Sequence, residues 1–207
     1  MAFNSFRPSE SSTPIVLNLI IINVIVFIAQ MVLDNSALDP NWFTNFLALY
    51  PFNTSYFEPY QLVTHMFAHG GFLHILFNMY ALWLFGAVLE RKWGPKKFLI
   101  FYFACGLAAG VTQMLLSPAP AIGASGAIMG LLAAFAFTFP NVEFYIIPFP
   151  FPIKAKWLAI IYGAIDIFGG FFGIGDNIAH FAHLGGLIMG LILAFLWNQN
   201  QKKTTYY

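Results

Sequence analysis

The chain has 207 residues, of which 59% are apolar and only 8% are charged, and its mean hydropathy is +0.74. A soluble domain carries about 25% charged residues, so this composition excludes a fully water-facing surface and predicts an all-α integral membrane protein. The net charge of +1 also indicates no nucleic-acid partner, which would require a basic surface.

Six apolar segments are predicted to be membrane-spanning helices, since a span needs about 20 mainly apolar residues. They are residues 15–33, 72–89, 97–116, 124–139, 157–172 and 178–197. The first is too long for the apolar region of a signal peptide and lacks a small-residue cleavage site after it, so we expect it to be retained. The fourth and fifth are short. We expect one six-helix domain over residues 14–197, between tails at residues 1–13 and 198–207.

The positive charges predict how these spans are oriented. Every lysine and arginine precedes span 1, follows span 6, or lies between spans 2 and 3 or spans 4 and 5. The connections after spans 1, 3 and 5 contain none. By the positive-inside rule, we expect both termini in the cytoplasm and the odd-numbered connections on the outer side.

The first outward connection, residues 34–71, is rich in aromatic residues and contains three acids and no base. This composition is typical of a segment that lies in the membrane interface. Two histidines near its end, His65 and His69, are expected to shape the loop that enters the second span.

The second and third spans each contain unusual residues. His74 and Asn78 are four residues apart at the start of span 2, so they share one helix face. Cys105 in span 3 is the only cysteine, which excludes an intrachain disulfide, and we expect it to be a small buried apolar side chain.

Spans 4 and 6 open with a matching pattern. Ser125 directly precedes the GxxxG pair Gly126–Gly130, and His183 shortly precedes the pair Gly186–Gly190. Such pairs let helix backbones approach closely in lipid. If the two small faces pack together, a hydrogen bond between Ser125 and His183 is geometrically reasonable.

These polar residues suit acyl-transfer chemistry. Polar groups within spans are expensive and usually functional. Serine is a weak nucleophile until a neighbouring imidazole takes its proton, as His183 would do for Ser125. The first turn of a helix offers backbone N–H groups to an oxyanion, and His74 and Asn78 could add side-chain donors.

No acid is well placed in the sequence to complete a triad. Asp166 lies in the middle of span 5, where we expect a neutral or paired buried acid, and Asp176 lies in the last outward connection. The residues therefore predict a Ser125–His183 dyad. His180, one turn before His183, is more simply explained as a hydrogen-bonded buried histidine.

Each of these features also has a plainer interpretation. A serine among small residues usually serves packing, and GxxxG pairs alone indicate only close helices. Five histidines could bind a metal, because imidazole suits zinc, copper and iron. The HEXXH motif is absent, however, and no carboxylates lie near the histidines in the sequence, so we expect no metal and no cofactor.

Taken in order, the motifs resemble those of the rhomboid intramembrane serine proteases, over about residues 14–197. GASGAIMG resembles the family's GxSG nucleophile motif, HGGFLHILFN its span-2 signature, and AHLGGLIMG its AHxxGxxxG motif. LERKWGPKKFLIFY resembles the turn between spans 2 and 3, in which the glutamate and arginine, here Glu90 and Arg91, are structural.

The resemblance implies a role for each matching residue. Ser125 would be the nucleophile and His183 the general base, while His74 and Asn78 would stabilise the oxyanion. His69 would have a structural role in the loop.

Two features depart from the family pattern. The family often has an aromatic residue four positions after the nucleophile, where this chain has Met129, so we expect altered packing there rather than lost activity. The Trp-Arg pair of the family's first outward loop is also missing, which puts the anchoring of that loop in doubt.

The resemblance implies a protease that cuts single-span membrane proteins in or near their transmembrane helices, within a plasma (bacterial inner) membrane. Residues 117–123 should enter the membrane as non-helical backbone, which requires a water-filled cavity or a protein lining. We expect such a cavity to open outward above Ser125. Substrate would enter beside span 5, whose glycines would ease its movement: Gly163, Gly169, Gly170, Gly173 and Gly175.

Three other functions remain open at this point. A rhomboid-like protein that binds membrane clients without cutting them would keep the fold, but it would be expected to have lost Ser125, His183 or Asn78. A small transporter would predict inverted repeats, which the sequence does not show. A metal-dependent membrane enzyme could be recognised by a metal assay.

Overall fold

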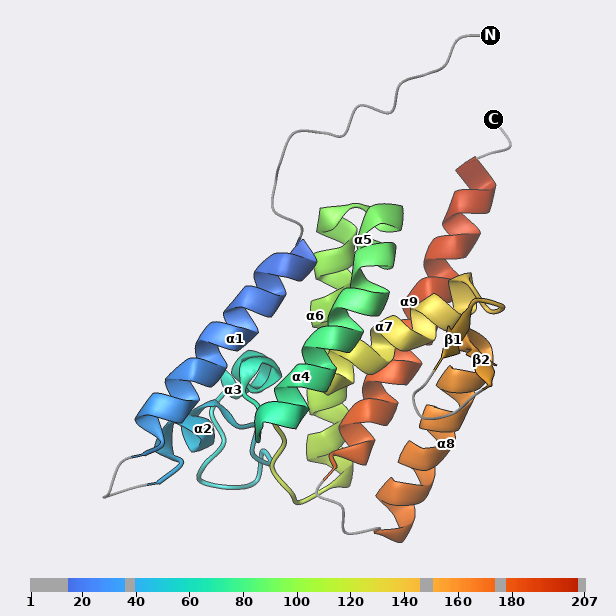
Figure 1. The fold of residues 1–207 in the computed structure, drawn as a ribbon. Coiled ribbons are helices and arrows are strands. Elements are labelled where there is room, and N and C mark those ends of the chain that lie inside the picture. Colours follow the sequence, from blue (N-terminus) through green and yellow to red (C-terminus); the bar gives the residue numbers. More distant parts are fainter. Residues whose placement is uncertain (1–14, 36–39, 146–150, 174–177, 205–207) are drawn as a thin grey trace, which may run out of the picture.

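The computed structural model describes residues 15–35, 40–145, 151–173 and 178–204, and most of them are helical (Figure 1). The helices are α1 (Ile15–Leu33), α2 (Trp42–Leu47), α3 (Gln61–Thr64), η1 (His65–Phe67), α4 (Phe72–Ala81), η2 (Leu82–Gly86), α5 (Ala87–Trp93), α6 (Pro95–Leu116), α7 (Ser125–Thr138), α8 (Ala155–Phe172) and α9 (His180–Thr204). Two short antiparallel strands, β1 (Glu143–Tyr145) and β2 (Pro152–Lys154), connect α7 to α8. The sequence did not predict this hairpin.

Five helical segments are long and apolar enough to cross a membrane: α1, the continuous run from α4 to α5, α6, α8 and α9. The fourth predicted span, α7, is also helical and apolar but has only 14 residues. The predicted positions of all six segments are confirmed to within a few residues at most ends. The count of six crossings stays a prediction, because α7 is too short to be assigned as a span by length alone.

The helix ends differ from the prediction at two places. The second span continues through a π-helical turn, η2, to Trp93, and Gly94 then turns the chain into α6. Gly94 has a φ of 81°, a left-handed conformation that favours glycine. At the other end of the chain, α9 continues to Thr204, so much of the predicted tail 198–207 is helical. Residues 1–13, the other predicted tail, lie outside the described residues.

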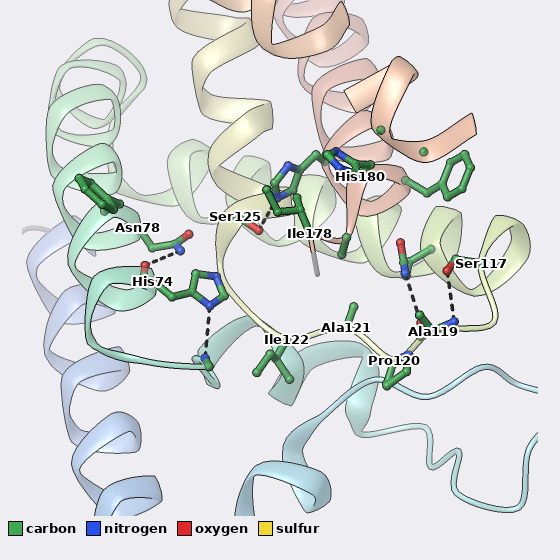
Figure 2. A pocket seen from close by; sticks show the side chains of 18 of the residues that line it. His74, Asn78, Ser117, Ala119, Pro120, Ala121, Ile122, Ser125, Ile178 and His180 are labelled. Atoms are coloured by element: carbon green, nitrogen blue, oxygen red, sulfur yellow. Dashed lines mark hydrogen bonds between the residues drawn. The ribbon is translucent and has the colours of Figure 1, made fainter. Parts of the chain in front are cut away.

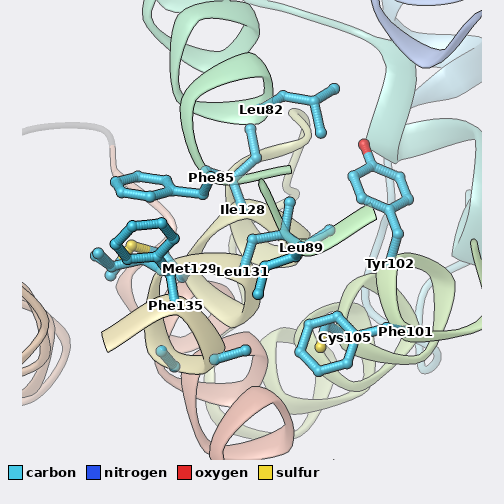
Figure 3. Packing of buried hydrophobic residues seen from close by; sticks show 14 of the residues in the cluster. Leu82, Phe85, Leu89, Phe101, Tyr102, Cys105, Ile128, Met129, Leu131 and Phe135 are labelled. Carbon is cyan, nitrogen blue, oxygen red and sulfur yellow. The ribbon is translucent and has the colours of Figure 1, made fainter. Parts of the chain in front are cut away.

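α7 is the central helix of the bundle, and α6 and α9 pack along it (Figure 1). Every residue from Gly126 to Ala136 is buried. Its large side chains join the main hydrophobic cluster (Figure 3), together with residues of η2, α5 and α6. Cys105 of α6 is fully buried in this cluster, as predicted, and Met129 is buried there too.

The two GxxxG pairs pack directly against each other, as their spacing suggested. A Cβ atom added at Gly186 would overlap the carbonyl oxygen of Gly126, and one added at Gly190 would overlap the carbonyl oxygen of Gly130. Only glycine leaves room for this contact between backbones. The α7–α9 contact therefore fixes the distance between the starts of the two helices.

α1 is joined to the bundle at its first residues. The backbone N–H groups of Ile15 and Val16 donate to the two carboxylate oxygens of Glu90, at 2.7 and 3.0 Å. A carboxylate suits this position because the first turn of a helix has unpaired N–H groups and a positive dipole end. The structural role expected for Glu90 is thus a cap on α1.

Candidate active site

A serine in the first turn of α7 meets a histidine in the first turn of α9. The Ser125 hydroxyl oxygen lies 2.8 Å from Nε2 of His183, within hydrogen-bond distance (Figure 2). Both side chains are partly buried. The glycine contacts between α7 and α9 begin one residue after Ser125, so they hold this pair in register.

The segment that leads into Ser125, residues 117–124, is non-helical, as predicted for 117–123. Gln113 of α6 holds it in place, because its side-chain amide donates to the carbonyl of Ala119 at 3.2 Å. The Gln113 side-chain oxygen also accepts the backbone N–H of Ala182, at 3.2 Å. One side chain of α6 therefore fixes both the segment before Ser125 and the start of α9.

A second set of contacts joins this segment to the loop before α4. Leu49 and Ala121 form an antiparallel bridge with two 2.9 Å hydrogen bonds, and the N–H of Gly123 donates to the carbonyl of His65 at 2.8 Å. Gly123 has a φ of 119°, and a Cβ there would lie 2.8 Å from Nε2 of His74. This position needs glycine for both reasons.

His74 and Asn78 face the cavity from α4 (Figure 2). The backbone N–H of Gly70 donates to Nδ1 of His74 at 3.2 Å, so in the neutral ring Nε2 carries the proton and can donate it. The Asn78 side-chain amide donates one hydrogen to the carbonyl of His74 at 2.8 Å. Its second amide hydrogen is not used by this bond.

Five residues singled out from the sequence line one cavity of about 840 Å³: His74, Asn78, Ser125, His180 and His183. Its walls are α4 on one side and the ends of α8 and α9 on the other, and Ser117 and residues 119–122 border it (Figure 2). The cavity thus brings together the four residues that were predicted to act in catalysis, Ser125, His183, His74 and Asn78, and His180 also lines it.

The expectation that no acid is placed to complete a triad was wrong. Oδ1 of Asp166 lies 3.0 Å from Nδ1 of His183 and 2.9 Å from Nδ1 of His180, and the Asp166 side chain is only 3% exposed. The predicted pairing of this acid is confirmed, as is the buried, hydrogen-bonded state of His180. Asp176, the other acid considered, lies outside the described residues.

Glycines on α8 allow this approach to α9. A Cβ at Gly169 would overlap the imidazole of His180, and one at Gly170 would lie 3.0 Å from the ring of Phe181. These two glycines, predicted to ease movement of the helix, therefore also serve close packing. Gly175 lies outside the described residues, and movement of α8 stays a prediction.

His65 and His69 shape the loop before α4, as expected. Nδ1–H of His65 donates to the carbonyl of Gln61 at 2.7 Å. The backbone of His69 is held by Gln30 of α1, whose amide oxygen accepts the His69 N–H at 3.0 Å and whose amide nitrogen donates to the His69 carbonyl at 3.2 Å. Burial lowers the pKa of each of these two imidazoles to about 4, so both are neutral near pH 7.

No group of three or more His, Cys, Asp or Glu side chains is arranged to hold a metal ion in the part of the chain that the structure describes. Asp166 is instead paired with His180 and His183, and His183 is paired with Ser125.

Comparison with known proteins identifies the protein family that this chain matches. The family model described as "Rhomboid domain" matches residues 56–200. Proteins named Rhomboid protease GlpG from Yersinia pseudotuberculosis serotype I (strain IP32953) and Yersinia pestis (strain Pestoides F) are each 30% identical over 193 residues, which cover 92% of this chain and 65% of theirs. The protein of that name from Yersinia enterocolitica serotype O:8 is 29% identical over 193 residues, covering 93% of this chain and 66% of its own. The chain thus spans about 65% of the length of these relatives.

Proposed function

Because this chain belongs to the rhomboid family, we propose that it is an intramembrane serine endopeptidase that hydrolyses peptide bonds in or near transmembrane segments. The observation that carries the proposal is the 2.8 Å contact between Ser125 Oγ and His183 Nε2 beside a cavity of about 840 Å³. The relatives named as rhomboid proteases support the same reaction class.

In the first step, Nε2 of His183 takes the hydroxyl proton of Ser125 while Oγ bonds to the carbonyl carbon of the substrate. The resulting tetrahedral intermediate carries a negative oxygen. When the C–N bond breaks, the imidazolium of His183 gives its proton to the leaving amine, and an acyl-enzyme remains. Water then attacks this ester with His183 again as the base, which restores Ser125.

The oxyanion would be stabilised by donors from two helices. The backbone N–H of Ser125 lies in the first turn of α7, where N–H groups have no partner within the helix. From α4, Nε2–H of His74 and the second amide hydrogen of Asn78 can donate, since His74 accepts from Gly70 at Nδ1 and Asn78 uses one amide hydrogen for the His74 carbonyl. Such preorganised donors are often the largest single contribution to catalysis.

Hydrolysis inside a membrane requires water, and the cavity beside Ser125 supports the proposal on this point. It has room for water and for a short stretch of substrate chain beside Ser125. Non-helical backbone such as residues 117–124 is tolerated at membrane depth where it lines a cavity of this kind.

We further propose that the substrates are single-span membrane proteins and that the enzyme lies in a plasma (bacterial inner) membrane, with both termini in the cytoplasm and the cavity open toward the outer face. The start of α1, the turn between α5 and α6, and the end of α9 lie toward the same end of the bundle (Figure 1). Basic residues cluster in the sequence near these points, which supports a cytoplasmic location for that end.

A fluorophosphonate probe tests the proposal directly, since it reacts only with an activated serine. The full chain in detergent should be labelled, whereas Ser125→Ala and His183→Ala should not be, with all three folded by circular dichroism. Absence of labelling in the folded wild-type protein, together with no cleavage of a membrane substrate, would contradict the proposed activity.

A further inference from the structure

We infer that Asp166 is a positioning residue for His183, so that the site operates as a chain of three side chains, Ser125, His183 and Asp166, rather than as a pair. This inference rests on the proposed function of the same site. It is carried by one carboxylate oxygen that lies within hydrogen-bond distance of Nδ1 on both His180 and His183.

The geometry determines which tautomer of His183 is present. A carboxylate oxygen only accepts hydrogen bonds, so both Nδ1 atoms beside Asp166 must carry hydrogen. Nε2 of a neutral His183 then has a lone pair, and this is the atom that lies 2.8 Å from the Ser125 hydroxyl. Without an acceptor at Nδ1, the ring could carry its hydrogen on Nε2 instead and could not take the serine proton.

The acid is also placed to stabilise the charge that forms during the reaction. The Asp166 side chain is 3% exposed, and Oδ2 is buried with no hydrogen-bond partner among the described residues. An acid in this state is costly inside a membrane protein. When His183 takes the serine proton, the positive imidazolium lies 3.0 Å from Asp166 Oδ1. The negative charge of Asp166 therefore stabilises the positive charge of His183 in the intermediate.

A purely structural role is the competing interpretation, because Asp166 also joins α8 to α9 through His180. The two roles predict different variants to be sensitive. A helix anchor would be weakened about equally by Asp166→Asn and by His180→Asn, with loss of stability in both. If Asp166 positions His183, Asp166→Asn should slow the reaction. His180→Asn should not slow it, because this variant keeps the bond from Asp166 to His183.

The experiment measures kcat and KM on a single-span membrane substrate, together with the rate of fluorophosphonate labelling, for the full chain in detergent. In Asp166→Asn we expect kcat and the labelling rate to fall by at least about tenfold, with KM within about twofold of the wild type. In His180→Asn we expect kcat to change by less than about threefold. A folded Asp166→Asn protein with wild-type kcat would overturn the inference.

A second measurement needs no activity and no Asp166 variant. ¹⁵N NMR of the wild-type chain labelled at histidine, with His183 assigned by comparison with His183→Gln, reports which ring nitrogen is protonated. We expect hydrogen on Nδ1 at neutral pH, and hydrogen on Nε2 would overturn the inference. A wild-type chain that shows this tautomer but neither cleaves nor labels would instead contradict the proposed protease activity.

Discussion

The two walls of the cavity are built in different ways. On one side, α7 and α9 touch through backbone atoms at glycine pairs, and this contact places Ser125 beside His183. On the other side, α4 and the loop before it are held by separate hydrogen bonds, such as those of Gly70 to His74 and of Gln30 to His69. Backbone contact leaves little freedom, whereas a hydrogen-bonded loop can lose one bond and keep the others.

This difference suits the chemistry proposed for each wall. Proton transfer from Ser125 to His183 depends on a short and constant distance, which packed helices provide. The opposite wall must accept a substrate chain and then surround its oxyanion, so its donors need only be within reach when substrate is bound. Variants in the α7–α9 wall should therefore lower folding stability and activity together. Variants in the α4 wall should change one of these two quantities more than the other.

Gly186→Ala should have the largest effect, since the added methyl overlaps the carbonyl oxygen of Gly126. Overpacking against backbone forces the helices apart, so we expect at least about 3 kcal/mol of lost stability and no detectable cleavage. Thermal unfolding in detergent measures the first and a cleavage assay the second. Gly163→Ala is the matched control on α8, because its methyl would lie 3.5 Å from Leu187 in ordinary contact and should be neutral or slightly stabilising. Similar losses in both variants would show that backbone contact is not what distinguishes the α7–α9 wall.

His74→Ala should give the next largest effect, and on activity rather than on folding. Removal of one oxyanion donor costs on the order of 10²–10³ in kcat in other serine hydrolases, and we expect a loss in this range. Asn78→Ala should cost less, because one of its two amide hydrogens already bonds to the His74 carbonyl. Steady-state kinetics with unfolding curves measures both, and a fall in stability that parallels kcat would contradict the separation expected for this wall.

Gln30→Leu tests the hydrogen bonds of the loop. It leaves the backbone N–H and carbonyl of His69 without their buried partner, at a cost of about 1–3 kcal/mol. The control is Asn35→Ala, which removes an exposed amide bond to the Met31 carbonyl and should change stability by less than about 0.5 kcal/mol. Equal unfolding temperatures for the two variants would show that Gln30 does not hold the loop.

Low pH should lower the folding stability of the protein through His65 and His69, in the loop before α4. This effect should be the smallest of the four predicted effects. Their folded pKa of about 4 lies below the ordinary value of 6.5, so the unfolded chain binds more protons between these values. Stability is therefore fully present above about pH 6.5 and is lost as the pH falls toward 4, by roughly 1–2 kcal/mol for the two histidines together at pH 6. Unfolding curves at pH 7 and pH 6 measure this loss, and His65→Phe should reduce it. A pH-independent wild type would contradict the prediction.

The sequence predicted which residues lie together at the cavity better than it predicted all of the contacts that these residues make. Ser125, His183, His74 and Asn78 each stand at a helix start or at a helical spacing, so local periodicity and the glycine pairs were enough to place them near one another. Asp166 could not be placed in this way, because it lies 17 residues before His183 on a different helix. Whether it reaches the imidazole depends on the rotation and depth of α8, which periodicity does not determine.

The same limit explains the other differences. The second span was predicted to end at residue 89, directly before three charged residues, yet helical hydrogen bonding continues to Trp93 and stops at Gly94. The hairpin of β1 and β2 pairs short segments with little strand pattern, so pairing rather than sequence preference defines it. Both cases involve partners that short-range patterns do not reveal.

On the proposed function, the length of α7 would set the depth in the membrane at which the peptide bond is cut. Its 14 residues extend about 21 Å, whereas the hydrocarbon core of a bilayer is about 30 Å thick. With the far end of α7 at one boundary, Ser125 would lie at least about 9 Å inside the other, because a tilted helix of this length covers less of the bilayer thickness. A substrate helix covers about 9 Å in about six residues. The bond that is cut would thus be chosen by its depth in the bilayer as well as by its side chains, and a thinner membrane would move the cut toward the end of the substrate helix.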